Sequence, residues 1–409
     1  MRQLENGLSE RTLAFEPGSE VHGEVVCRTF QPSYVVTRAG VLIAFCQGRL
    51  RGGRDDDPKV ILTSRSRDWG ATWSPARAVS GRITHYAVSA YLSERDGRER
   101  VSVLSMVDLR GTENIYDKDY GEMRAQSGID IDAVGCDTPM VLCRFDSDDD
   151  GDTWTMETLL GDRSPLNHRY SDGTLIMFNA VGQVHAISEG PYRGRYVLGG
   201  PVTVVPEGEA VTNYFRNHPQ SGSAVIYSDD QGETWRVDGF ITDYLANEAS
   251  AVSINRGEEL LLVRRLNSRG MLEAHVPFSD VRPGPMQRVA HTSTDCGKTW
   301  SRPFLVDISG VLCHGTLARG GRRLLFSIPN GSGLPESERQ HATERQRGAI
   351  YFSDDEGQTW RHKVIEPETF SYSTVGPLNE SQYITLYACS SMGQEGVGCR
   401  VFEDAWLDA

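Results

Sequence analysis

The sequence lacks long apolar runs and helical periodicity. None of its 409 residues lies in a stretch that approaches the roughly 18 apolar residues of a membrane-spanning helix. The hydrophobic residues instead fall in short runs of four to seven, rich in Val, Ile, Leu, Phe and Tyr and separated by turn residues. Such runs are typical of strands. The sequence therefore predicts an all-β protein with no membrane span.

Cysteine and histidine motifs are also missing. The eight cysteines form no CxxC pair, and the ten histidines show no zinc-type spacing. We therefore expect no metal and no cofactor. Free thiols are favoured, with Cys136–Cys143 and Cys389–Cys399 as the candidate disulfides.

Positive charge is scarce, because 42 Lys and Arg face 56 Asp and Glu, for a net charge of −14. This balance argues against nucleic acid or an anionic membrane as a partner. An anionic ligand would need arginines clustered at its site, because the net negative charge of the whole protein repels anions. Residues 1–20 lack the apolar core of a signal peptide. We therefore expect a cytoplasmic protein, or a secreted one if the start was trimmed.

What the sequence does contain is an eight-residue pattern, Ser-x-Asp-x-Gly-x-Thr-Trp, found five times between strand-like runs. It predicts a β-turn whose Asp accepts hydrogen bonds from backbone N–H groups and whose Gly takes a positive φ. The Trp would bury its ring against the neighbouring strand and fasten the turn. We expect these boxes to be architectural and their aspartates not to be catalytic. The boxes span 66–73, 147–154, 228–235, 293–300 and 353–360.

The spacing of the boxes predicts a six-bladed β-propeller. Their tryptophans recur every 60 to 81 residues, and a four-stranded blade needs roughly 45–70. Five boxed blades and one unboxed blade, closed by the N- and C-terminal strands, fit the length. The polar stretch 107–135 is too long for a hairpin and is expected to cover one face. No linker divides the chain, so we expect one domain over 1–409.

The boxes resemble the Asp-boxes of sialidases (exo-α-neuraminidases) of the cellular and bacterial type, and longer segments resemble the family in its order. "CRTFQPSYVVTRAGVLIAFCQGR" is similar to the Arg-Ile-Pro opening, strand and Gly-Arg ending, although "RTFQP" is two residues longer. "NEASAVSINRGEELLLVRR" resembles the segment with the catalytic glutamate and second triad arginine. "CHGTLARGGRRLLFSIPN" and "RQRGAIYFSDDEGQTW" resemble the strands around the third arginine. "FSYSTV" resembles the motif of the nucleophilic tyrosine.

The resemblance implies an exo-α-sialidase that acts with retention on terminal sialic acid, a sugar with a carboxylate on its anomeric carbon. Arginine forks bind such a carboxylate in a bidentate manner. By position the arginine triad is Arg28, Arg264 and Arg345. Arg265 adjoins Arg264, and neighbours on a strand face opposite sides; the spacing favours Arg264. Arg347 is the alternative to Arg345.

A tyrosine nucleophile is the family's exception to carboxylate chemistry. A carboxylate nucleophile would meet the substrate's own carboxylate, whereas a neutral phenol avoids that repulsion. Its pKa of about 10 requires a neighbouring base to take the proton. The resemblance implies Tyr372 and Glu248 as that pair.

The resemblance also implies an aspartate acid on the loop "GGRDDDPKV". Spacing favours Asp55, then Asp56, with Asp57 the remaining member of the run. Arg49 would contact a ring hydroxyl. Two other functions stay open: a glycan-binding propeller without catalysis, and a hydrolase for a related nonulosonic acid. A neutral substrate, as for an exo-arabinanase, would not need three arginines.

Overall fold

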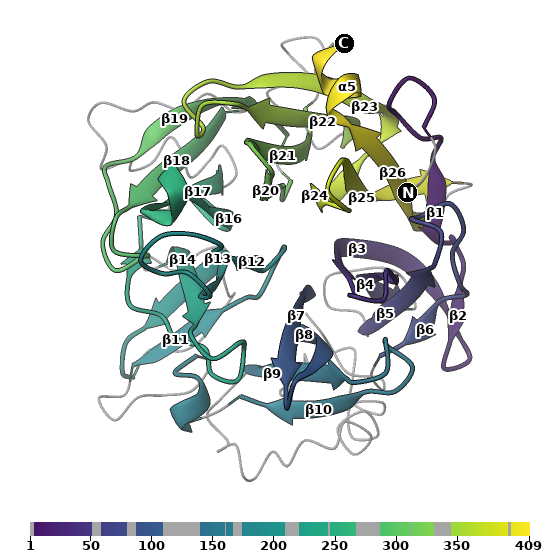
Figure 1. Ribbon diagram of the computed structural model, residues 1–409. Coiled ribbons are helices and arrows are strands. Elements are labelled where there is room, and N and C mark those ends of the chain that lie inside the picture. Colours follow the sequence, from purple (N-terminus) through teal and green to yellow (C-terminus); the bar gives the residue numbers. More distant parts are fainter. Residues whose placement is uncertain are drawn as a thin grey trace.

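The protein, seen in a computed structural model, is a ring of six antiparallel sheets around a central axis (Figure 1). This confirms the predicted all-β, six-bladed β-propeller. The described residues are 4–50, 59–79, 87–108, 140–159, 161–166, 174–208, 221–243, 246–266, 287–311, 313–330, 345–391 and 394–409.

Each sheet is one blade, and the blades follow one another along the chain. The first contains β2 (Glu20–Val21), β3 (Glu24–Val36), β4 (Leu42–Leu50), β5 (Lys59–Ser66) and β6 (Arg77–Ala78). The second contains β7 (Ser89–Arg95), β8 (Arg98–Asp108), β9 (Met140–Ser147) and β10 (Thr155–Thr158). The third contains β11 (Leu175–Phe178), β12 (His185–Ala186), β13 (Tyr196–Val205), β14 (Ser221–Ser228) and β15 (Phe240–Ile241).

The remaining blades each have four strands in the described part of the chain. The fourth contains β16 (Ala246–Ile254), β17 (Glu259–Leu266), β18 (Gln287–Ser293) and β19 (Phe304–Ser309). The fifth contains β20 (Thr316–Gly320), β21 (Arg323–Pro329), β22 (Gln346–Ser353) and β23 (Arg361–Thr369). The sixth contains β24 (Ser371–Pro377), β25 (Gln382–Ser391), β26 (Gln394–Glu403) and β1 (Thr12–Phe15). Short helices are η1 (Gly161–Arg163), η2 (Asn255–Gly257) and α5 (Asp404–Asp408).

The ring is closed by strands from the two ends of the chain. Strand β1 pairs with β26 antiparallel, with Thr12 opposite Cys399, so both ends build the sixth blade (Figure 1). Ser9 extends this pairing, because its backbone N–H donates to the carbonyl of Val401 at 2.8 Å. The sixth blade is also the one without a box, as the sequence predicts.

Each box is a turn after the third main strand of its blade, as expected. In the third box the backbone N–H and hydroxyl of Thr234 donate to Asp230 at 2.9 and 2.7 Å. Gly232 has φ 91°, and the ring of Trp235 is fully buried. The sequence interpretation missed the serine, since Ser228 Oγ accepts the N–H of Gly232 at 2.7 Å.

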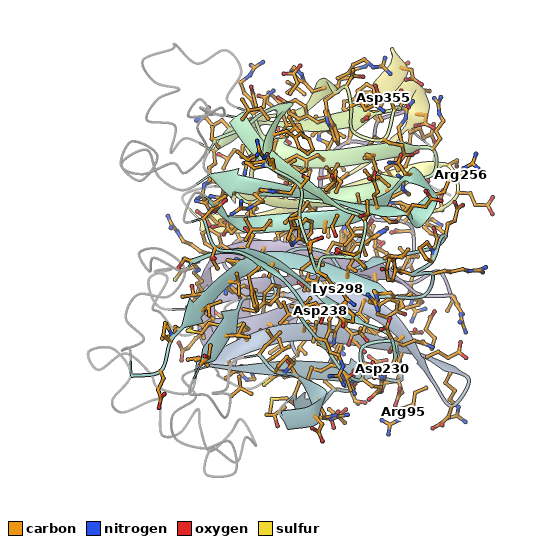
Figure 2. All side chains as sticks on the ribbon, turned by 90° about the vertical axis from the view of Figure 1, so that its left-hand side faces the viewer. Arg95, Asp230, Asp238, Arg256, Lys298 and Asp355 are labelled. Atoms are coloured by element: carbon orange, nitrogen blue, oxygen red, sulfur yellow. The ribbon has the colours of Figure 1, made fainter. Side chains whose placement is uncertain are left out.

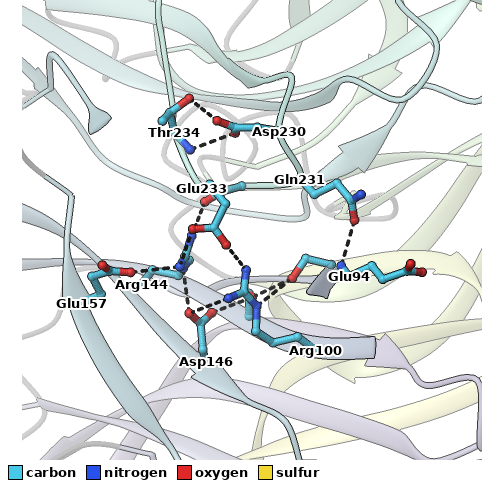
Figure 3. Close-up of polar contacts among 12 residues, drawn as sticks. Glu94, Arg100, Arg144, Asp146, Glu157, Asp230, Gln231, Glu233 and Thr234 are labelled. Carbon is cyan, nitrogen blue, oxygen red and sulfur yellow. Dashed lines mark hydrogen bonds and ion pairs between the residues drawn. The ribbon is translucent and has the colours of Figure 1, made fainter. Parts of the chain in front are cut away.

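Box residues also tie neighbouring blades together. Glu233 of the third box pairs with Arg100 and Arg144 of the second blade, and Arg144 also binds Asp146 at 2.8 Å (Figure 3). Both guanidiniums are buried. Buried charges need such partners, because an unpaired one costs far more than a paired one. The acidic character of the boxes is therefore structural here.

The cysteines are free thiols wherever the structure describes them. The candidate disulfide between Cys389 and Cys399 is wrong: both side chains are buried and unbonded in the sheet of the sixth blade. Cys143 is also free, and its candidate partner Cys136 lies outside the described residues. Most of the expected loop 107–135 lies outside them too.

Candidate active site

Most of the expected site residues that the structure describes lie near one another, on the face opposite the boxes. Arg345 directly precedes β22, and Ser353, which opens the fifth box, ends it. Arg345 and this box therefore lie at opposite ends of one strand. Asp230 and Asp355, from two different boxes, lie toward the same side of the ring (Figure 2). The boxes thus occupy one face, and the other is left to the site.

At the centre of the site is a hydrogen bond between Tyr372 and Glu248. The Tyr372 hydroxyl, on β24, donates to Glu248 Oε1, on β16, at 3.3 Å. These strands belong to the fourth and sixth blades, which are not neighbours, so the contact must lie close to the axis. Burial and the charge of Glu248 raise the pKa of Tyr372, while Arg265 and Arg345 oppose this. The phenol is thus neutral and can donate its proton to Glu248.

Glu248 is held ionised by cations around it. Burial alone would raise the pKa of its carboxyl, but the charges of Arg265 above all, and of Arg345, bring it below the usual value. Arg265 forms a direct ion pair with the second carboxylate oxygen of Glu248. The carboxylate therefore has one oxygen on a guanidinium and the other on the phenol, which suits a proton acceptor.

Arg264 does not face this pair, so the expected orientation of the strand is wrong. Its Nη1 and Nη2 donate to the two oxygens of Asp243 at 2.6 and 2.7 Å. The remaining N–H groups go to Ser223 Oγ, His291 Nε2 and the carbonyl of Ala246. A guanidinium has five N–H donors, and all five are used here. None is left for a ligand.

Arg265, the alternative, takes the place expected for Arg264. It contacts Glu248, and its Nε is buried with no acceptor among the described residues. The sequence could not show which of the two faces inward because β16 carries a bulge. Ala246 pairs with Leu266 but Ala249 pairs with Arg264. The extra residue shifts the relation between the glutamate and the paired strand.

Arg345 contacts the tyrosine directly, whereas Arg49 is linked to it through Phe30. The guanidinium carbon of Arg345 lies 4.8 Å from the centroid of the Tyr372 ring, so the residue favoured over Arg347 contacts the nucleophile candidate. The guanidinium carbon of Arg49 lies 3.9 Å from the centroid of Phe30. The Phe30 ring in turn meets Tyr372 edge to face at 5.3 Å. Phe30 thus connects Arg49 to the centre of the site.

Arg28 lies further out and is paired with a residue that sequence reasoning missed. Its Nε lies 3.4 Å from Glu395 Oε1, and its side chain is 49% exposed. Burial raises the pKa of Glu395, opposed by the charges of Arg28, Arg49 and Arg345. Glu395 therefore lies among three of the expected arginines. It has no signal in the sequence, because it belongs to the polar stretch "SSMGQEGVG".

Two more buried basic residues beneath the site were not expected. Arg288 Nη2 donates to the carbonyls of Val311 and Cys313 at 3.0 and 2.7 Å. Burial and the charge of Arg265 lower its pKa to about 10. Burial likewise lowers the pKa of His314 to about 4, so its ring is neutral. The only signal for His314 was its place in the matched segment "CHGTLARGG".

The balance of charge in the described part of the site suits an anion. Five guanidiniums face two carboxylates there, in a chain of net charge −14. Arg265 Nε and Arg288 Nε are buried, and no residue that the structure describes accepts a hydrogen bond from either. The residues of this set are Arg28, Arg49, Arg265, Arg288, Arg345, Glu248 and Glu395. The expected acids Asp55 and Asp56, with Asp57, lie outside the described residues.

The described ranges hold no cluster of three or more His, Cys, Asp or Glu side chains arranged to bind a metal. No helix there has the length and apolar character needed to cross a bilayer.

Comparison with known proteins agrees with the fold and the motifs. A family model described as a BNR repeat-like domain matches residues 125–384. A sialidase of Micromonospora viridifaciens is 28% identical over 387 residues, which cover 92% of this chain and 51% of that protein. The chain therefore spans about half the length of this curated relative.

Solved structures share the propeller at low identity. Trypanosoma rangeli sialidase superimposes with a TM-score of 0.65 at 18% identity, covering 99% of this chain and 61% of that one. A protein of unknown function from Dyadobacter fermentans gives 0.62 at 15% identity, covering 97% and 99%. The matched repeats show that the chain belongs to the BNR repeat-like family, and the solved structures show that it shares its propeller fold with sialidases.

Proposed function

We propose that the protein is an exo-α-sialidase, which hydrolyses terminal sialic acid from glycoconjugates with retention of configuration. The observation that carries the proposal is the partly buried hydrogen bond from Tyr372 to Glu248, with Arg265 and Arg345 beside it. A Trypanosoma rangeli sialidase of the same fold is known as a covalent intermediate with 2,3-difluorosialic acid. Such an intermediate is what a tyrosine nucleophile would form here.

In the first half-reaction, Arg265 and Arg345, with Arg28 nearby, bind the carboxylate of the sugar. The Tyr372 oxygen attacks the anomeric carbon while its proton passes to Glu248. The bond to the leaving oxygen breaks, and that oxygen takes a proton from an acid, for which we propose Asp55 or Asp56. Arg49 would contact a ring hydroxyl.

In the second half-reaction, water attacks the anomeric carbon and the bond to Tyr372 breaks. The aspartate takes the water proton, and Glu248 returns its proton to the phenolate. Each group ends in its starting state, and two displacements at one carbon retain its configuration. The phenol is an advantage here because it approaches a carbon that carries a carboxylate without adding a second negative charge.

The test is Tyr372→Phe, assayed with a fluorogenic sialoside and with 2,3-difluorosialic acid. The variant should lose turnover by about 10²-fold or more, as expected when a nucleophile is removed, and still bind a sialic acid analogue. In the wild type, mass spectrometry should find the fluorosugar attached to Tyr372. Tyr91→Phe, which removes a hydroxyl buried between the second and third blades, is the control and should keep native turnover.

Two results would favour a different function. A wild type that binds sialosides without cleaving them is a glycan-binding propeller. One that prefers a des-N-acetyl analogue acts on a related nonulosonic acid.

A further inference from the structure

We propose that Arg264, held by Asp243, is a positioning residue that fixes the backbone bulge on which Glu248 sits. The effect of Arg264 on catalysis rests on the proposed function. The hydrogen bonds by which Arg264, with Asp243 and Ser223, holds the bulge (the clamp) do not.

The bulge is visible in the pairing of β16 with β17. Ala246 lies opposite Leu266, and the next described pair is Ala249 with Arg264. Two residues on β16, one of them Glu248, therefore oppose the single residue Arg265. A bulge of this kind leaves one residue without a ladder partner and turns its side chain away from the regular alternation. The direction of the Glu248 side chain is thus set by a part of the strand whose backbone conformation the ladder hydrogen bonds do not fix.

Arg264 supplies the missing constraint. Its Nη2 donates to the carbonyl of Ala246, the residue that begins the bulge, at 3.1 Å. Its Nε donates to Ser223 Oγ on β14 at 3.0 Å, which connects the bulge to the third blade. The guanidinium is fully buried. It therefore joins the bulge of the fourth blade to a strand of the third.

Asp243 and His291 hold that guanidinium in a single orientation. Asp243 binds it in a bidentate manner at 2.6 and 2.7 Å. His291 has its pKa lowered to about 4 by burial and by Arg264, so its ring is neutral. Its Nδ1 lies 2.9 Å from the Ser301 carbonyl, which places the proton there. Nε2 is then free to accept from Arg264 at 3.1 Å.

The position of Glu248 has to be precise because its carboxylate accepts a hydrogen bond from the Tyr372 hydroxyl, 3.3 Å away. A displacement of about 1 Å in a catalytic group can cost roughly 10²-fold in rate. Arg264 touches neither Tyr372 nor Glu248, so it would act only through the backbone.

The experiment compares Arg264→Lys with Arg323→Lys in the full chain. Arg323 is an equally buried arginine, paired with Asp354 and Asp404, but it lies at the other end of its blade from the site. Both variants should lose stability in urea unfolding. Only Arg264→Lys should lower kcat, by about 10²-fold, with KM within about threefold. It should slow labelling of Tyr372 by 2,3-difluorosialic acid to the same degree.

A second readout does not depend on activity. Amide hydrogen exchange of the peptide containing 246–250 should accelerate at least tenfold in Arg264→Lys and stay native in Arg323→Lys. If Arg264→Lys does not fold, Ser223→Ala removes one bond of the clamp and should show a smaller change of the same kind. Native exchange and native kcat in a folded Arg264 or Ser223 variant overturn the inference. If the wild type neither turns over sialosides nor is labelled, the proposed function is overturned instead. The hydrogen-exchange result then still tests whether Arg264 holds the bulge.

Discussion

Arg264 and Arg265 show how two adjacent residues of one type take opposite roles. A strand sends neighbouring side chains to opposite sides, and here one side is a packed interface between blades and the other faces the site. Arg264 has an acceptor for every donor, whereas Arg265 pairs with Glu248 and has a buried Nε for which the described part of the chain supplies no acceptor. A guanidinium with unused donors beside a neutral phenol is the one able to bind an anion.

We therefore predict that Arg265→Lys weakens binding of sialic acid analogues at least tenfold. Losing a charge-assisted, bidentate contact costs about 1.5–3 kcal/mol, because a lysine cannot reproduce the planar fork. Isothermal titration calorimetry measures the change. Arg319→Lys serves as the control, since Arg319 is paired with Glu356 of the fifth box, away from the site. Equal affinities of Arg265→Lys and wild type would remove Arg265 from carboxylate recognition.

The residues of the site were only partly readable from the sequence. Tyr372 and Glu248 stand in recognisable segments, and the structure brings them into contact. The side of the strand on which Arg264 lies was predicted wrongly, because a bulge depends on how the strands pair in the folded protein. No sequence pattern indicated Glu395 as a site residue, because its contact with Arg28 joins the first and sixth blades. Contacts between blades depend on the closure of the ring, which no local pattern records.

At the scale of elements, the boxes were the most predictable part of the chain. The hydrogen bonds that form the turn itself are local, four residues apart or less, so the sequence pattern alone is enough to predict the turn. The box aspartates accept the backbone N–H and the hydroxyl of the box threonine in all five copies. What the pattern does not show is how deeply each tryptophan is buried, because this depends on the neighbouring blade.

We predict that the box tryptophans differ in their contribution to stability. Trp235 is fully buried in the core between the second and third blades, so Trp235→Ala should lower the free energy of unfolding by about 3–5 kcal/mol. Trp73 is only partly buried at the edge of its cluster, and Trp73→Ala should cost less than half as much. Urea unfolding gives both values. Comparable losses would show that the boxes contribute through the turn rather than through the buried ring.

At the scale of the whole molecule, the propeller gathers positive charge near its axis while the net charge is −14. The ring makes this possible because each blade brings its own strand ends to the same place. The arginines converge from the first, fourth and fifth blades, although they are distant in sequence. The same closure buries basic side chains that a single sheet would leave in water, among them His291 and His314.

These two histidines predict how the stability of the whole molecule changes with pH. Burial lowers the pKa of each from 6.5 to about 4. Between these values the unfolded chain binds more protons than the folded one, so stability falls as the pH falls through this window. Each histidine contributes a slope of about 1.4 kcal/mol per pH unit. The box aspartates, whose pKa is lowered by hydrogen bonds from the box threonines despite their partial burial, lose their contribution at more acidic pH.

His314→Gln should therefore flatten the profile. Between pH 7 and pH 5 the free energy of unfolding should drop by about 2 kcal/mol less in this variant than in the wild type, because one of the titrating groups is gone. Urea unfolding at the two pH values measures it, and His362→Gln, at an exposed position, should keep the wild-type slope. A His314→Gln profile parallel to the wild type would mean that His314 takes up its proton in the folded protein as readily as in the unfolded chain. It would then be a cation beside Glu248 at pH 5, and the basic residues around the site would include one that is charged only in acid.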